Sequence, residues 1–93
     1  MKSKELCTHY DDSVDSALIL FEKYPRSART EALDESRFID YAEDGHVVMV
    51  ELHEVSSGVD LTGLPSPERI GRALGELAGA RGWTNFRVRG AAS

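Results

Sequence analysis

The feature that most constrains the fold of this chain is a hairpin signal near its middle. Asp44-Gly45 stands between two apolar runs, residues 38–41 and 46–53. Glycine takes a positive φ without steric cost, and Asp-Gly between apolar runs is a strong hairpin signal. The second run is apolar on both faces at its start, which is typical of a central strand. The sequence therefore predicts two adjacent antiparallel strands, the second of them inside the sheet.

Three further segments have the pattern of short strands. Residues 17–21 are apolar on both faces, which indicates a strand covered on both sides. Residues 6–10 form a first strand, and residues 29–33 are mostly polar, as in an edge strand. With the hairpin they predict a β-meander core over 6–57. A short terminal strand is expected within 83–89.

A helical period replaces the alternation after a connecting loop at 58–65. Ile70, Leu74 and Leu77 recur on one helical face. Ser66 stands where an N-cap is needed and Gly82 where a left-handed C-cap is needed, so the helix is expected over 66–82. The predicted fold class is α+β: an antiparallel sheet of four or five short strands with one C-terminal helix packed on one face, in a single domain of residues 1–93.

Three glycines form a ridge beside the apolar stripe of this helix: Gly71, Gly75 and Gly79. Each costs the helix about 1 kcal/mol relative to alanine. The ridge either lets the helix approach a neighbouring element closely or reflects a chain rich in glycine and alanine. The sequence leaves both interpretations open.

Composition excludes several classes of function. Sixteen acidic residues against eleven basic ones give a net charge of −5, which argues against nucleic-acid binding and suits a basic protein partner. No apolar run is long enough to span a membrane, and the first residues lead into no signal-peptide core. A single cysteine, Cys7, fits a reducing compartment. A cytoplasmic protein is expected.

No pattern of side chains specifies a reaction, a metal or a cofactor. Cys7 and His9 share a strand face, but His46 and His53 lie on another strand and are predicted to face opposite ways. A tetrahedral zinc site needs three or four ligands, so we predict no metal site, with Cys7 as a small buried hydrophobic residue. The acidic cluster of Asp11, Asp12 and Asp15 is predicted to serve turns, because a calcium loop would also need a glycine and a distal glutamate.

Residues 8–57 carry a recognisable set of motifs. Tyr10-Asp11 is followed by Asp15, and residues 39–48 read Ile-Asp-Tyr-Ala-Glu-Asp-Gly-His-Val-Val. This half of the chain resembles the bacterial domain-of-unknown-function family 2283, although Ala17, Leu18 and Ala42 depart from its usual residues. The resemblance implies a compact β-rich core without an established activity. Because members often lie beside small toxin-like genes, it also implies an antitoxin-like or partner-binding role.

The leading functional hypothesis is a non-catalytic, self-associating protein-interaction module, and a homodimer is expected. One helix can cover one face of the sheet, so the other face would expose the apolar residues Leu18, Leu20, Val47 and Met49. The alternative for this face is that the linker residues Val59, Leu61 and Leu64 fold back over it and leave a monomer. The alternative for function is a small enzyme or ligand-binding protein with a site near His9, Asp11 and Asp15.

Overall fold

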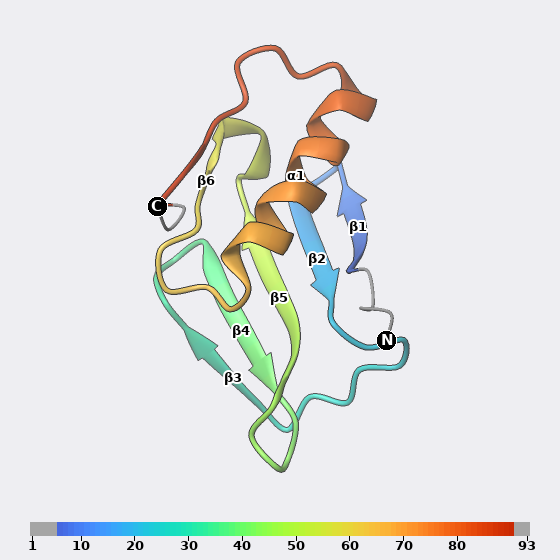
Figure 1. The fold of residues 1–93 in the computed structure, drawn as a ribbon, viewed down its shortest axis with the longest axis vertical. Helices are drawn as coiled ribbons and strands as arrows, with labels where there is room; N and C mark the ends of the chain where they lie inside the picture. The colour runs from blue at the N-terminus through green and yellow to red at the C-terminus, as the bar shows by residue number, and fades with distance from the viewer. Residues whose placement is uncertain (1–5, 91–93) are drawn as a thin grey trace.

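The computed structural model describes residues 6–90 and shows an α+β fold, a five-stranded antiparallel sheet with one C-terminal helix (Figure 1). The strands of this sheet are β1 (Cys7–Asp11), β2 (Ser16–Leu20), β3 (Arg29–Ala32), β4 (Arg37–Tyr41) and β5 (Val47–His53). A 3-10 turn η1 (Val55–Ser57), β6 (Val59–Asp60), the helix α1 (Pro67–Arg81) and β7 (Val88–Arg89) follow. The predicted fold class is confirmed.

The strand order is β1-β2-β5-β4-β3, so β5 is the central strand and β3 an edge, both as predicted. The predicted meander is wrong, because a meander would place β3 beside β2. Instead β5 pairs with β2 on one side and β4 on the other. The physical reason is that β2 and β5 are the two apolar strands and gain most from neighbours, whereas all four residues of β3 are exposed.

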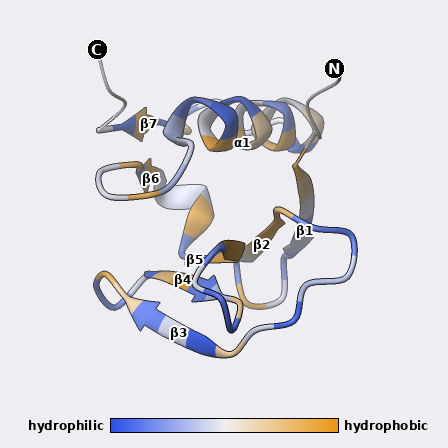
Figure 2. Ribbon diagram, turned by 60° about the horizontal axis from the view of Figure 1, so that its bottom comes forward, coloured by the Kyte–Doolittle hydropathy of each residue, from blue (hydrophilic) through white to orange (hydrophobic). Residues whose placement is uncertain are grey.

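The helix and the linker pack on the same face of the sheet (Figure 2). Buried residues of both join those of the sheet in one core cluster: Ala17, Ile19, Ile39, Val50, Leu52, Val55, Val59, Leu61, Leu64, Ile70 and Leu74. The segment predicted as a connecting loop also contains β6, which pairs in parallel with β7. The C-terminal tail therefore returns beside the linker.

The sequence predicted the C-terminal cap of α1 correctly and its N-terminal cap incorrectly. Gly82 ends the helix at φ +73, and its N–H bonds the carbonyl oxygens of Ala78 and Gly79, as expected for a left-handed cap. The cap predicted at Ser66 is wrong, because its backbone is left-handed at φ +47 and its side chain makes no capping hydrogen bond. An N-cap side chain normally needs an extended backbone to reach the first free N–H groups.

Only one glycine of the helical ridge lies in a close approach. A Cβ at Gly71 would come within 3.2 Å of Leu61 Cδ1, whereas a Cβ at Gly75 or Gly79 would meet nothing within 4 Å among the described residues. The tight contact between α1 and the linker therefore accounts for Gly71 and leaves the other two glycines without a packing role in this fold.

The β4–β5 turn is built around Gly45, which has φ +97. Ala42 N–H bonds the His46 carbonyl at 2.8 Å, and Gly45 N–H bonds the Ala42 carbonyl at 2.9 Å. Just beyond the turn the register shifts between Asp40 and Tyr41, so that Tyr41 pairs with Val47. Such a bulge changes which face the following side chains take.

We expect Gly45→Val to destabilise the protein by more than about 1 kcal/mol, because valine strongly disfavours a positive φ. A Cβ at this position would meet no atom of the described residues within 4 Å, so the loss reports mainly backbone strain. Urea titration gives the free energy of unfolding. Gly45→Asn is the matched control, since asparagine tolerates this conformation better, and it should lose clearly less stability. Equal losses would contradict the assignment.

Candidate interaction face

The face of the sheet turned away from α1, called the outer face below, carries an apolar group from three neighbouring strands. Leu20 of β2 pairs with Met49 of β5, and Leu18 pairs with Glu51, which pairs in turn with Phe38 of β4. Leu18 is 38% exposed, and Leu20, Phe38 and Met49 are partly buried. Within residues 6–90 no helix or strand lies over this group, since α1, β6 and β7 are all on the other side (Figure 2).

Three of the four residues predicted for an interface are brought together here: Leu18, Leu20 and Met49. Val47 is not, because the register shift places it opposite Tyr41, and both side chains pack against the core. Phe38 completes the group and was missed. Its alternation with Ile39 in the first hairpin arm was the signal that could have placed it on this face.

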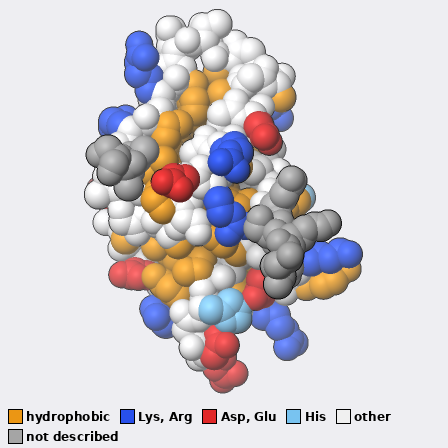
Figure 3. Space-filling model, in the orientation of Figure 1, with side chains coloured by type: hydrophobic (Ala, Val, Ile, Leu, Met, Phe, Trp, Pro, Cys, Tyr) orange, Lys and Arg blue, Asp and Glu red, His pale blue; other side chains and the backbone are white. Residues whose placement is uncertain are grey.

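The linker does not cover the outer face. Val59, Leu61 and Leu64 are buried in the cluster that contains Ile70 and Leu74 of α1, on the opposite side of the sheet. The surface over α1 mixes charged, polar and hydrophobic side chains (Figure 3). The monomer alternative weighed from the sequence, in which the linker shields the second face, therefore does not describe this fold.

Two carboxyl groups lie beside the apolar group on the outer face. Asp40 is 1% exposed, and its Oδ1 accepts a hydrogen bond from the Thr30 hydroxyl, but its Oδ2 has no hydrogen-bond partner among the described residues. The adjacent Asp40 carboxyl group and burial together raise the pKa of Glu51 to about 7. The diagonal position of the two carboxyl groups across β4 and β5 depends on the register and could not be read from spacing.

His53 lies at the end of the outer face nearest the β1–β2 turn. Its Nδ1 is 2.9 Å from Ser16 Oγ, and its ring lies edge-on to Phe38 at 5.4 Å between centroids. A shallow hollow of about 540 Å³ opens there, lined in part by Val14, Phe38 and His53. Val14 is 64% exposed, and Glu35 and Glu54 also line this hollow, so this end of the outer face is of mixed polarity.

The alternative site near His9, Asp11 and Asp15 is not assembled. Asp11 accepts hydrogen bonds from the backbone and hydroxyl of Ser13, and His9 is exposed on β1 with its Nε2 3.5 Å from Cys7 Sγ. None of the three lines the more enclosed cleft, of about 230 Å³, whose walls include Arg37, Asp60 and Arg89. Asp11 therefore serves the turn, as predicted, whereas Asp12 accepts a hydrogen bond from Arg81 Nη1 of α1 at 2.8 Å.

Asp15 is the most heavily used of these acids. Its carboxylate accepts the Tyr10 hydroxyl at 2.6 Å, the Ser56 N–H at 3.0 Å and the Ser56 hydroxyl at 2.7 Å. Burial disfavours its charged form, but these hydrogen bonds outweigh burial and lower the pKa of Asp15 below its usual value. The carboxylate ties the β1–β2 turn to η1 and has no evident role in chemistry.

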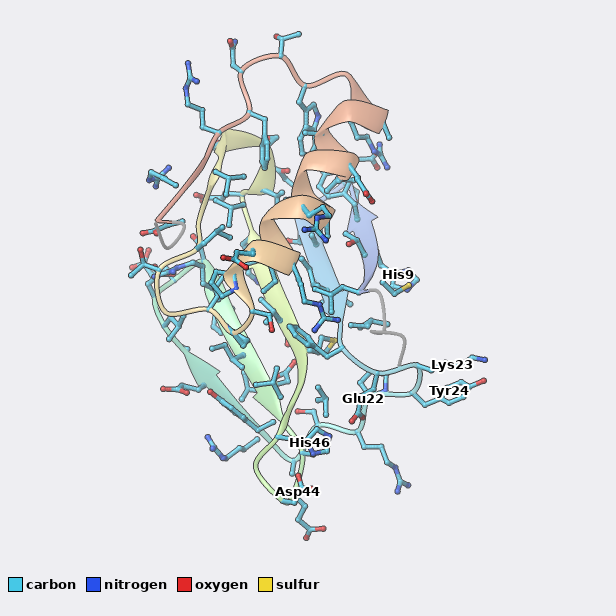
Figure 4. All side chains as sticks on the ribbon, viewed as in Figure 1. His9, Glu22, Lys23, Tyr24, Asp44 and His46 are labelled. Atoms are coloured by element: carbon cyan, nitrogen blue, oxygen red, sulfur yellow. The ribbon has the colours of Figure 1, made fainter. Side chains whose placement is uncertain are left out.

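No three histidine, cysteine, aspartate or glutamate side chains in residues 6–90 are grouped so that they could hold a metal ion. Cys7 is exposed, and the prediction that it is buried is wrong, because β1 is an edge strand and Cys7 pairs with Leu20 of the outer face. His46 lies at the β4–β5 turn, far from His9 (Figure 4). Its Nε2 contacts Glu22, and its Nδ1 is 2.5 Å from Asp44.

The contacts of His46 generate a prediction about pH. Hydrogen bonds to Glu22 and Asp44 raise the pKa of His46 above 6.5. The stabilisation is therefore complete below pH 6.5 and is lost as pH rises through the higher pKa of the folded state. In urea titrations we expect His46→Gln to lower the unfolding midpoint more at pH 5.5 than at pH 8.5. An equal loss at both pH values would show that protonation of His46 contributes nothing.

A second prediction concerns metal content. Elemental analysis of the purified, untagged protein should find no stoichiometric transition metal, because the described residues offer no set of three ligands. One zinc per chain that disappears in both Cys7→Ser and His9→Ala would overturn this prediction and revive the alternative site.

Comparison with known protein families identifies one family. The family model described as "Protein of unknown function (DUF2283)" matches residues 8–56, from β1 to η1. No curated protein and no solved structure matches the chain. Within residues 6–90 no helix is long and apolar enough to cross a membrane.

Proposed function

The chain belongs to the DUF2283 family of proteins of unknown function, and from this premise we propose that it is a non-catalytic protein-interaction module that self-associates. The surface used is the outer face, and its occupant is the same face of a second copy. The observation that carries the proposal is that the apolar linker is buried with α1, so that no helix or strand within residues 6–90 covers Leu18, Leu20, Phe38 and Met49.

The physical argument begins with the cost of leaving such a face in water. Each of these side chains gains about 1.5–3 kcal/mol when burial is complete. Leu18 is still 38% exposed and its three neighbours only partly buried, so part of this free energy is not realised in a single chain. Soluble proteins rarely expose a contiguous apolar patch larger than a few hundred Å² unless it binds something.

The shape of the surface favours a second copy as the occupant. An open sheet face is most simply covered by another sheet face, about 10 Å away and rotated by roughly 30°. A two-fold axis through the outer face would pair each apolar group with its own copy and close the assembly at two chains. The net charge of −5 also suits a basic protein partner of the toxin kind, and this antitoxin-like role stays a second hypothesis.

The area of the face sets the expected strength. Five strands spaced about 4.8 Å apart and about 17 Å long give a face of roughly 400 Å², or roughly 800 Å² buried in a dimer. This area lies at the weak end of specific interfaces. We therefore expect a dimer that forms at micromolar or higher concentrations and dissociates on dilution, rather than an obligate one.

Leu18→Lys tests the proposal. Sedimentation velocity from about 1 to 100 µM should show a monomer–dimer equilibrium for the wild type and a monomer for the variant. Leu18 is already 38% exposed and lies opposite Glu51, so lysine can extend into water and lie near a carboxylate without disrupting the fold. Circular dichroism checks that the variant remains folded.

Ala80→Lys is the matched control, because it adds the same charge at an exposed position of α1. It should dimerise like the wild type. A wild type that stays monomeric up to about 100 µM, or a Leu18→Lys variant that dimerises as well as Ala80→Lys, would reject the outer face as the interface.

A further inference from the structure

We propose that pairing of two chains through the outer face takes up protons at Glu51, so that the protein associates more tightly as pH falls from 8.5 to 6.5. This inference rests on the proposed self-association and adds its regulation. It follows from where Asp40 and Glu51 lie on the face and from the hydrogen bond that Asp40 Oδ2 lacks among the described residues.

Asp40 and Glu51 lie near the middle of the outer face. Glu51 lies on β5, the third strand of five, and Asp40 on the adjacent β4. A two-fold axis through the middle of the outer face therefore brings the β5 strands of both chains opposite each other. Two Asp40 and two Glu51 carboxyl groups then share one layer between the sheets, from which most water is excluded. Four ionised carboxylates in such a layer would repel one another and lose their hydration.

The unpaired oxygen of Asp40 indicates that a proton on Glu51 would be stabilising. Asp40 Oδ2 is buried and finds no donor in the part of the chain that the structure describes, because an ionised Glu51 can only accept. A protonated Glu51 carries an O–H group that can donate to Asp40. Protonation therefore removes one charge, satisfies a buried acceptor and leaves a layer that a second sheet can cover.

The other groups on the outer face do not supply a cation. Only apolar or hydroxyl side chains come from β2 and β3: Ser16, Leu18, Leu20, Thr30 and Ala32. Cys7, His9 and Asp11 lie on β1 at one edge, and His53 lies two residues from Glu51 on β5. No lysine or arginine occupies this face within the paired strands, so Glu51 has no fixed positive charge to keep it ionised there.

The size of the effect follows from linkage. Asp40 and burial already raise the pKa of Glu51 to about 7 in the single chain, so a proton is available near neutral pH. Between pH 8.5 and 6.5 the dimer dissociation constant should fall roughly 25-fold if the dimer requires one such proton, and roughly 600-fold if it requires two.

The experiment measures dimer dissociation constants by sedimentation at pH 6.5, 7.5 and 8.5 for the wild type and Glu51→Gln. Glutamine keeps the shape of a protonated glutamate and can donate to Asp40 at every pH. We expect the variant to bind at pH 8.5 at least about tenfold more tightly than the wild type and to lose most of the pH dependence. Glu76→Gln removes an exposed carboxylate of α1 and should behave like the wild type.

Asp40→Asn is a second variant that keeps Glu51 titratable. Without the neighbouring charge, the midpoint of the pH dependence should move down by about one pH unit or more. A wild type that dimerises equally at all three pH values would overturn this inference and leave the proposed self-association standing. So would Glu51→Gln with the full pH dependence, which would assign the protons to histidines such as His46. A wild type that is monomeric at every pH would reject both proposals.

Discussion

The burial of Ile70 and Leu74 of α1 against Ile19 and Val50 of the sheet is the contact on which the rest of the structure depends. Fully burying each such side chain contributes about 1.5–3 kcal/mol, and a domain of this size has few other sources of stability. With α1 on one face of the sheet, the linker residues Val59, Leu61 and Leu64 join the same core and do not cover the other face. The chain adds the linker to the core.

Polar contacts hold the linker and its neighbours in place on the helix side. Asp15 binds both the backbone and the hydroxyl of Ser56 from the β1–β2 turn. Arg37 of β4 reaches the linker, where its Nη1 donates to the carbonyl oxygens of Asp60 at 2.9 Å and Thr62 at 2.5 Å. Several of these partners are backbone groups that would otherwise need water, so the contacts both satisfy the linker and fix which side of the sheet it occupies.

Because the linker packs with α1, no helix or strand of the described residues covers the outer face. This face keeps Leu18, Leu20 and Met49 partly open and places the buried carboxyl of Asp40 beside Glu51. A carboxyl pair in an apolar setting adds little to stability, since each charge loses hydration. The Asp40–Glu51 pair fits the proposed interface, where a second chain would bind more tightly as pH falls. The proposed self-association and its proposed dependence on protons would share one cause: no helix or strand within residues 6–90 covers this face.

The sequence by itself determined the elements whose signals are local. Gly45 marks the turn, the apolar period gives α1, and two-sided strands predict a sheet with a central β5, because these patterns depend on residues a few positions apart. Only the tertiary structure decided the strand order, the bulge that turns Val47 into the core, and the meeting of Asp40 with Glu51. Each of these depends on register between strands, which is set by packing of the whole sheet and is not written in any local spacing.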